Sequence, residues 1–252
     1  MIEISRQKSR PFNIAHRGAS SLSPENTFPA FDLAFESGAE GLEFDVQLSK
    51  DNIPVIIHDE SLERTTTGEG PVKDLTLKEL KTLDAGSWFA ADYKGATVPT
   101  LEEVLKKYKD RCTLFDLELK NRFINYPGLE EAVMEQFARY QLEDRVIISS
   151  FNADSLITCR RLKPAVRTGL IYLEEIKDPW HYISSLGCYS AHPLYIYLQD
   201  PKTLAGFRTH NIPLYPWTVN DPEQMEYLVS EKVEGIITDF PQELTKITGQ
   251  TG

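Results

Sequence analysis

The amino-acid sequence predicts an α/β fold, a (β/α)8 TIM barrel with a small insertion between the second strand and the second helix. Short apolar runs rich in β-branched and aromatic residues alternate with amphipathic stretches along the chain, which indicates repeated βα units and a parallel sheet. One apolar run follows its predecessor after a link too short for a parallel crossover. Eight runs therefore remain for the barrel, the number that the fold requires.

Nine apolar runs have strand character, one more than the barrel holds. They span residues 12–16, 41–46, 55–58, 113–119, 146–149, 168–172, 189–191, 214–218 and 235–238. Only Ser49-Lys50-Asp51-Asn52 separates the second run from the third, and a link this short forms an antiparallel hairpin. We therefore expect residues 55–58 to fold back along residues 47 and 48.

Amphipathic stretches follow the barrel strands and are predicted to form the outer helices. They span residues 29–37, 101–109, 129–140, 153–162, 179–186, 201–210, 222–230 and 241–247. Phe28, Phe31 and Phe35 recur at the spacing of one helix face. Thr100 and Asp221 precede stretches with acidic first turns, which is typical of N-terminal caps.

Residues 47–99 form the predicted insertion. This segment contains the hairpin and a short helix expected at residues 77–83. The chain shows no internal repeat, low-complexity segment or interdomain linker. We therefore expect a single (β/α)8 domain over residues 1–252.

Composition and charge narrow the class of partner and the compartment. A net charge of −11 argues against nucleic acid or an anionic membrane surface as the main partner. Cys112, Cys159 and Cys188 form an odd, widely spaced set that is typical of a reducing compartment. Residues 1–12 lack the apolar core of a secretory signal, and no apolar run reaches the roughly 20 residues of a membrane span. We expect a cytoplasmic protein without stable membrane insertion; its oligomeric state stays open.

Two predicted strands carry acids on one face. Glu43 and Asp45 alternate with apolar residues in the second strand, and Glu118 does so in the next barrel strand. Because both sides of a barrel strand are covered, these carboxylates should point toward the barrel axis, where they repel one another unless a cation lies between them. Such a set without thiols or clustered imidazoles favours one divalent cation, Mg²⁺ or Ca²⁺. The alternative is salt bridging to Lys120 or Arg17.

Two histidines are candidates for acid–base catalysis at the same end of the barrel. His16 ends the first strand, and the hairpin register places His58 near the mouth of the barrel. Two histidines beside a metal can serve as general acid and base in phosphodiester cleavage, although a histidine at a strand end is often structural. Arg17 and Lys120 are candidates for holding the phosphate oxygens, which an acidic protein can bind only through local cations.

Other polar and aromatic residues follow later strands. Phe151 and Trp217, with Tyr172 as a further candidate, could form an apolar wall for a small polyol or could simply belong to the core. His192 either lines the pocket or caps the barrel. The chain contains no GxGxxG, Walker A or GxSxG motif, which excludes the commonest nucleotide-binding and serine-hydrolase patterns.

An ordered set of motifs resembles the glycerophosphodiester phosphodiesterase family over nearly the whole chain. The blocks are His16-Arg17-Gly18, Pro24-Glu25-Asn26-Thr27, Glu43-Phe44-Asp45-Val46, His58-Asp59, Leu62-Glu63-Arg64-Thr65-Thr66, Leu117-Glu118-Leu119-Lys120, Ser149-Ser150-Phe151, Trp217-Thr218-Val219-Asn220 and Gly235-Ile236-Ile237-Thr238-Asp239. Leu119 stands where the family frequently has Ile, a conservative change on the helix-facing side of the strand.

The resemblance implies an enzyme that hydrolyses glycerophosphodiesters to glycerol 3-phosphate and an alcohol by metal-assisted acid–base catalysis. It implies that His16 and His58 are the catalytic pair, for which we favour His16 as the acid and His58 as the base. The family pattern further assigns the metal to Glu43, Asp45 and Glu118 and the phosphate to Arg17 and Lys120. Attack by water and attack by a glycerol hydroxyl, through a cyclic phosphate, both fit these residues.

Three other functions are compatible with the sequence. A phospholipase C-like or lysophospholipase D-like phosphodiesterase would need an exposed apolar rim, of which Trp88-Phe89 is the only hint. A non-catalytic barrel that binds a phosphorylated ligand would leave the histidines and acids without a role. In a sugar-phosphate isomerase or aldolase, Lys120 would be the Schiff-base candidate. The preferred alcohol head group stays open.

Overall fold

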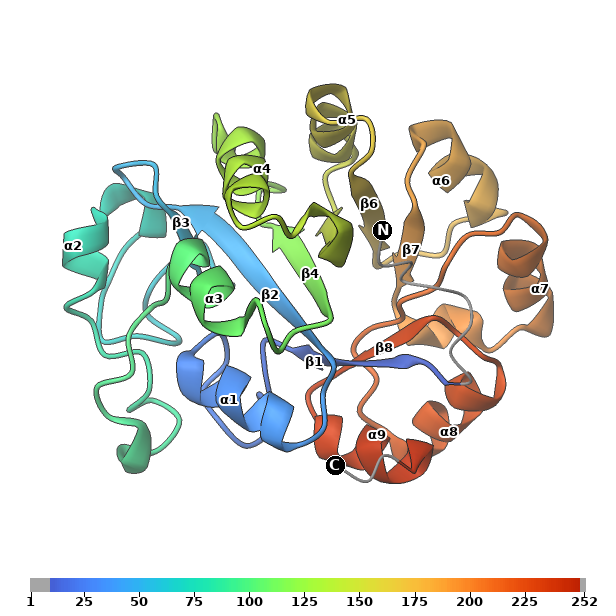
Figure 1. Ribbon diagram of the computed structural model, residues 1–252, viewed down its shortest axis with the longest axis horizontal. Coiled ribbons are helices and arrows are strands. Elements are labelled where there is room, and N and C mark those ends of the chain that lie inside the picture. Colours follow the sequence, from blue (N-terminus) through green and yellow to red (C-terminus); the bar gives the residue numbers. More distant parts are fainter. Residues whose placement is uncertain (1–9, 250–252) are drawn as a thin grey trace.

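The computed structural model describes residues 10–249 and is organised around a curled parallel sheet with helices on its outside (Figure 1). The strands are β1 (Phe12–His16), β2 (Gly41–Leu48), β3 (Pro54–Ile56), β4 (Leu114–Leu119), β5 (Val146–Ser150), β6 (Arg167–Tyr172), β7 (Ser190–Pro193) and β8 (Gly235–Thr238). Their order is β7-β6-β5-β4-β2-β1-β8, with every neighbouring pair in this path parallel. The termini of the predicted span, residues 1–9 and 250–252, lie outside the described residues.

The hairpin expected after the second strand is confirmed. β3 pairs with β2 in antiparallel register, with Val46 opposite Ile56 and Leu48 opposite Pro54. Asn52 occupies the turn with φ = 59°, a left-handed conformation that asparagine tolerates better than most residues. β3 therefore lies off the barrel path, and it carries the chain toward His58.

The predicted strand at residues 214–218 is not a regular strand, which corrects the sequence-based expectation. It is reduced to isolated bridges because Pro216 has no backbone N–H to donate to a ladder. The segment still lies between β7 and β8: the Tyr215 amide donates to Ala191 O at 3.0 Å, and the Ile237 amide donates to Pro216 O at 3.0 Å. These hydrogen bonds connect β7 and β8 through residues 214–218, where the regular β-ladder is interrupted.

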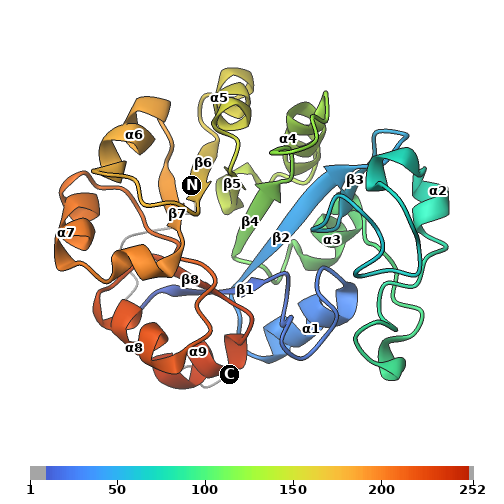
Figure 2. The same ribbon diagram turned by 180° about the vertical axis from the view of Figure 1, so that it is seen from behind.

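The helices lie around the outside of the sheet, as the views from the front and from behind show (Figure 2). They are α1 (Phe28–Glu36), α2 (Leu77–Leu80), α3 (Leu101–Tyr108), α4 (Leu129–Arg139), α5 (Ala153–Leu162), α6 (Pro179–Leu186), α7 (Pro201–Thr209), α8 (Pro222–Ser230) and α9 (Pro241–Thr248). Both predicted caps are present: Thr100 forms a capping box with Glu103, and Asp221 accepts from the Gln224 amide at 3.1 Å. Among residues 10–249, no helix combines the length and apolar character needed to cross a membrane.

The two faces of β2 separate the core from the site. Phe44 is fully buried, and its ring lies 6.1 Å from that of Phe31 in α1 and 6.3 Å from that of Phe115 in β4. The apolar face thus packs on the helix layer, as predicted. Because side chains alternate along a strand, Glu43 and Asp45 consequently point to the inside of the sheet.

The insertion lies beside β2 (Figure 1). It has a small apolar core of its own. Its buried members are Val55, Ile57, Leu62, Val72, Leu80, Ala85 and Val98. The short helix expected at residues 77–83 ends at Leu80. This core fixes the segment that contains His58 and Arg64 against the open end of the sheet.

Candidate active site

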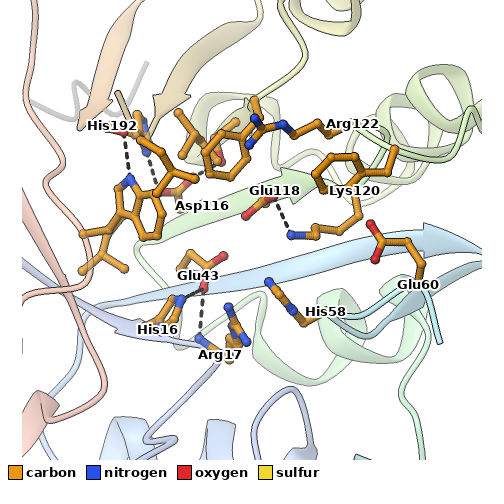
Figure 3. A pocket seen from close by; sticks show the side chains of 17 residues that line it. His16, Arg17, Glu43, His58, Glu60, Asp116, Glu118, Lys120, Arg122 and His192 are labelled. Carbon is orange, nitrogen blue, oxygen red and sulfur yellow. Dashed lines mark hydrogen bonds and ion pairs between the residues drawn. The ribbon is translucent and has the colours of Figure 1, made fainter. Parts of the chain in front are cut away.

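A cavity of about 290 Å³ opens at the carboxyl ends of the parallel strands, and it collects the predicted site residues (Figure 3). Nearly all of them line it: His16, Arg17, Glu43, His58, Glu118, Lys120, Phe151, His192 and Trp217. The exceptions are Asp45, which is fully buried beside the cavity, and the further wall candidate Tyr172, which belongs to the buried core and does not line the cavity. Residues separated by up to 201 positions therefore meet because parallel strands end at one edge of the sheet.

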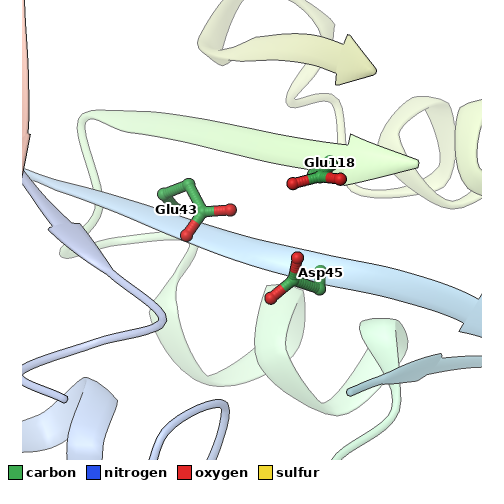
Figure 4. A group of neighbouring side chains, drawn as sticks. All are labelled: Glu43, Asp45 and Glu118. Carbon is green, nitrogen blue, oxygen red and sulfur yellow. The ribbon is translucent and has the colours of Figure 1, made fainter. Parts of the chain in front are cut away.

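The three predicted metal-binding acids form one cluster (Figure 4). Glu43 and Asp45 come from β2, and Glu118 comes from β4 directly opposite Asp45. One carboxylate oxygen from each lies within 4.8 Å of the others. Strand alternation makes the three side chains point inward, and the register between β2 and β4 sets the distance between their carboxylates.

The electrostatics of this cluster are those of crowded, buried acids. Burial, followed by the charge of Asp45, raises the pKa of Glu43 well above its usual value. Burial likewise raises the pKa of Glu118 to about 7, with Lys120 opposing and Asp45 adding to the shift. Burial also opposes ionisation of Asp45, but Arg17 and Lys120 outweigh it and hold the pKa of Asp45 below its usual value.

Two cations flank the acids. Lys120 Nζ lies 2.8 Å from Glu118 Oε1 and 3.6 Å from Asp45 Oδ1, and Arg17 Nε lies 3.3 Å from Asp45 Oδ2. The salt bridges that we considered as the structural alternative are therefore present. They leave Asp45 Oδ1 buried without a hydrogen-bond donor among the described residues. An all-oxygen set of three carboxylates with one such oxygen fits a hard divalent ion.

The loop after β1 presents Arg17 to the cavity. The Arg17 amide donates to Glu43 Oε2 at 3.0 Å, and its guanidinium NH1 donates to Glu25 Oε1 at 2.8 Å. Gly18 follows with φ = 87°, and a Cβ there would lie 2.6 Å from the carbonyl carbon of Ala30. Only glycine allows the loop to approach α1 this closely, and the approach places Arg17 at the mouth.

His16 is oriented by a carboxylate that we did not predict. Its Nδ1 lies 2.6 Å from Asp239 Oδ1, which leaves Nε2 toward the cavity and 3.9 Å from Glu43 Oε2. Asp239 also accepts from Ser20 Oγ at 2.8 Å and Asn220 Nδ2 at 2.6 Å. Burial opposes ionisation of Asp239, but these hydrogen bonds lower its pKa to about 2. The sequence feature that could have identified Asp239 is its position directly after the last strand, at the end of the barrel where catalytic groups gather.

His58 is oriented by the residue that follows it. Its Nδ1 lies 2.5 Å from Asp59 Oδ1, so Nε2 is again the nitrogen left for proton exchange. Burial is the largest influence and lowers the pKa of His58 below its usual value, although the charge of Asp45 opposes this shift. Neutral imidazole, the form that accepts a proton, is therefore favoured.

The backbone at His58 is held by a buried amide, also missed by sequence reasoning. Gln47 Nε2 donates to the carbonyl oxygens of Ile57, His58 and Asp59 at 2.9, 3.0 and 2.7 Å. Tyr126 OH donates to Gln47 Oε1 at 2.7 Å, which fixes the amide orientation. Gln47 lies on the same inward face of β2 as the acids, and that alternation was its only sequence signal.

The other side of the cavity is largely aromatic. The rings of Phe151 and Trp217 meet edge to face with centroids 5.7 Å apart, and the Arg122 guanidinium lies 5.1 Å from the Phe151 centroid. Trp217 Nε1 donates to His192 O at 2.9 Å. At the rim, Phe123 is 77 % exposed.

His192 lies in the floor of the cavity and is almost completely buried. Its Nδ1 lies 3.2 Å from Asp116 Oδ2, its Nε2 lies 2.9 Å from Ser190 Oγ, and its ring stacks on Tyr215 at 5.2 Å. His192 therefore lines the cavity, one of the two roles considered for it, while these contacts hold its ring in the barrel interior. Its predicted contact with substrate stays a prediction.

Comparisons with known proteins show that the chain is similar in sequence and fold to phosphodiesterases. The model of the glycerophosphoryl diester phosphodiesterase family matches residues 16–243. A glycerophosphodiester phosphodiesterase of Caldanaerobacter subterraneus subsp. tengcongensis is 44 % identical over 239 residues, which cover 95 % of this chain and 98 % of the relative. One from Bacillus altitudinis is 40 % identical over 92 % of this chain and 96 % of its own.

Two solved structures show that the chain is also similar to phosphodiesterases in fold. The Oleispira antarctica phosphodiesterase, determined in complex with the product sn-glycerol-3-phosphate, matches with a TM-score of 0.84 and 31 % identity, covering 96 % of this chain and 98 % of that one. The structure of an Agrobacterium tumefaciens glycerophosphodiester phosphodiesterase gives the same TM-score at 29 % identity, covering 92 % and 98 %. These matches confirm the resemblance drawn from the ordered motifs and the barrel fold.

Proposed function

Because the chain belongs to the glycerophosphoryl diester phosphodiesterase family, we propose that this enzyme hydrolyses glycerophosphodiesters to glycerol 3-phosphate and an alcohol with the aid of a divalent cation. One observation carries the proposal. Two imidazoles, each oriented through Nδ1 by its own carboxylate, face one cavity beside three clustered acids. This arrangement supports proton transfer to and from a phosphodiester held between them.

Glu43, Asp45 and Glu118 would hold the cation, for which we propose Mg²⁺ or Ca²⁺. A bound divalent ion supplies positive charge that offsets the negative charge of a phosphodiester. Two observations support this assignment. Asp45 Oδ1 is buried and accepts no hydrogen bond from the described residues. The raised pKa of Glu43 reflects burial beside other carboxylates, a repulsion that a bound cation would relieve. Arg17 and Lys120, beside the same acids, would bind the phosphate oxygens.

We assign His58 as the general base and His16 as the general acid. His58 Nε2 takes the proton of the attacking hydroxyl, either water or the neighbouring glycerol hydroxyl, and the lowered pKa of His58 suits this role. His16 Nε2 gives a proton to the departing alkoxide, which leaves as the alcohol. Attack by the glycerol hydroxyl forms a cyclic phosphate, which water then opens to glycerol 3-phosphate.

The aromatic wall is proposed to contact the alcohol of the substrate. Truncation of Trp217 to Ala should raise KM roughly fivefold, since aromatic contacts of this kind contribute on the order of 1 kcal/mol, with a smaller change in kcat. Trp217→Phe keeps a ring but loses the Nε1 bond to His192 O, so it separates ring contact from hydrogen bonding. Steady-state kinetics on glycerophosphocholine measure both. Equal KM for Trp217→Ala and the wild type would contradict the wall.

The exposed rim favours a second candidate, a lysophospholipase D-like activity. Phe123 is 77 % exposed and Leu173 is 42 % exposed, and both line the cavity, so the mouth presents the exposed apolar rim that such an activity would need. An acyl chain could lie along this rim while the phosphodiester occupies the polar side. Comparing turnover of glycerophosphocholine and lysophosphatidylcholine ranks the two candidates.

The central experiment measures release of glycerol 3-phosphate from several glycerophosphodiesters. The purified protein is assayed as prepared, after chelation, and after addition of Mg²⁺ or Ca²⁺. We expect release that chelation abolishes and a divalent ion restores. A His58→Gln preparation made in parallel controls for contaminating hydrolases. Absence of glycerol 3-phosphate would overturn the proposed function, and turnover unaffected by chelation would overturn the role of the three acids.

We propose a cytoplasmic location for the enzyme, with a small-molecule phosphodiester as its partner. Cys112, Cys159 and Cys188 are all buried free thiols, which a reducing compartment preserves.

A further inference from the structure

Arg64 of the insertion is partly exposed at the surface, and its guanidinium donates four hydrogen bonds to carboxylates. Its side chain is 43 % exposed, yet it contacts two separate carboxylates. Nε and NH2 donate to Asp59 at 2.5 and 2.9 Å, while NH1 and NH2 donate to Glu25 at 2.7 and 2.8 Å. A planar guanidinium suits such paired contacts, and a lysine could not reproduce them.

Each of these carboxylates also holds a residue of the proposed reaction. Asp59 Oδ1 lies 2.5 Å from His58 Nδ1, and Glu25 Oε1 accepts from Arg17 NH1 at 2.8 Å. An unbroken path of hydrogen bonds therefore runs from the imidazole through Arg64 to the phosphate-binding guanidinium. Its ends belong to different parts of the chain, the insertion and the loop after β1.

We propose that Arg64 is a positioning residue that fixes His58 and Arg17 relative to one another across the mouth of the cavity. The inference rests on the proposed function, because it assigns a purpose to the distance between a base and a phosphate ligand. Arg64 acts through Asp59 and Glu25 and does not line the cavity.

Removal of Arg64 would leave two acids without their shared counterion. Among the described residues, the Asp59 carboxylate would keep His58 as its one side-chain partner and would gain freedom to rotate, and the imidazole would rotate with it. Glu25 would keep Arg17 as its one hydrogen-bond partner among residues 10–249, and it would then draw the guanidinium away from the phosphate. The hydrogen bonds from Arg64 are also the largest influence that lowers the pKa of Asp59 to about 2.

A purely structural role accounts poorly for these contacts. The insertion is already held by its apolar core and by the three bonds from Gln47 Nε2. Arg64 itself is 43 % exposed to solvent, and ion pairs at the surface contribute on the order of 1 kcal/mol each to stability. Loss of Arg64 should therefore change activity far more than folding.

The kinetic test compares Arg64→Met and Arg64→Lys with the wild type. We expect Arg64→Met to lower kcat/KM on the order of 10- to 100-fold, as loss of an orienting partner does at metal sites, with kcat falling through His58 and KM rising through Arg17. Arg64→Lys should recover only part of the loss. Arg208→Met is the matched control: Arg208 is an exposed arginine paired with Glu231, away from the cavity, and its loss should leave both constants unchanged.

Double variants test the path. In the Asp59→Asn background, Arg64→Met should have little further effect on kcat, and in the Glu25→Gln background it should have little further effect on KM. Fully additive effects in both backgrounds would overturn the path. So would an Arg64→Met enzyme that matches the wild type, or one whose loss of activity equals its loss of folded protein in a thermal melt.

A measurement without substrate separates failure of this inference from failure of the proposed function. The proton between His58 Nδ1 and Asp59 should give a downfield NMR resonance that broadens or disappears in Arg64→Met. The corresponding proton between His16 and Asp239 serves as an internal control and should persist. If wild-type enzyme releases no glycerol 3-phosphate, the proposed function fails while this resonance still decides the positioning. An unchanged His58 resonance would overturn the inference even in an active enzyme.

Discussion

Replacement of either His16 or His58 by Gln is expected to lower kcat by roughly 10²- to 10⁴-fold, the usual contribution of a positioned acid or base. Each imidazole has one nitrogen on a carboxylate and the other free for proton transfer, and glutamine cannot carry out that transfer. KM should change little, since Arg17 and Lys120, the cations proposed to bind the phosphate, remain. His181→Gln, on the exposed surface of α6, is the control and should keep full activity.

The leaving group distinguishes the two roles. A p-nitrophenyl ester needs no proton on its departing oxygen, so an enzyme without its general acid should lose much less activity on that substrate. We expect His16→Gln to recover on the p-nitrophenyl ester and His58→Gln to remain impaired on both substrates. The reverse pattern would exchange the assignments. Full activity of both variants on the natural diester would remove the two-histidine mechanism.

Loss of one acid from the cluster is the second large effect. Asp45→Asn should lower kcat/KM by about 10²-fold or more and abolish the response to Mg²⁺ or Ca²⁺, since neutralising developing charge contributes several kcal/mol. Asp45 is the acid whose pKa is lowered, so it is the carboxylate that stays charged most readily. Activity assays at increasing concentrations of the divalent ion measure the change. Glu102→Gln, at an exposed position on α3, should respond to the ion as the wild type does.

Thermal melts give a test of the same site without substrate. The raised pKa of Glu118, about 7, means that its contribution to the stability of the metal-free protein is fully present below about 4.5 and is lost as pH rises through about 7. At higher pH the buried carboxylates are ionised and repel one another, and a bound divalent ion would offset this loss of stability. The rise in Tm that the ion produces should therefore be larger at about pH 8 than at about pH 5.5. A shift independent of pH, or one retained by Asp45→Asn, would contradict ion binding at the cluster.

Local patterns were sufficient for most of the fold. The four-residue link at Ser49 to Asn52 can only join antiparallel strands, and the caps at Thr100 and Asp221 use side chains within three residues of their targets. The segment at residues 214–218 was different. Its apolar content resembles a strand, but Pro216 removes a donor, and whether neighbouring backbones accept the remaining bonds depends on β7 and β8.

Some residues of the candidate site could likewise be predicted from local patterns, and others could not. Glu43, Asp45 and Glu118 could be predicted to converge because strand alternation is local and neighbouring barrel strands are consecutive in sequence. Strand alternation and strand order could not predict all the residues that orient the histidines. Asp239 lies 223 positions from His16, and Glu25 lies 39 from Arg64. Such contacts depend on loop conformations and side-chain directions that no short-range pattern contains.

The sequence alone determined the barrel class, the inward direction of the acids and the ends of most helices, because each follows from the period of a strand or helix and from chemistry within a few residues. Only the tertiary structure decided which carboxylate orients each imidazole, how residues 214–218 fill the gap in the sheet, and that Arg64 joins the insertion to the loop after β1. The physical reason is that hydrogen bonds between distant segments require both backbones to be placed first, and that placement results from packing of the whole barrel.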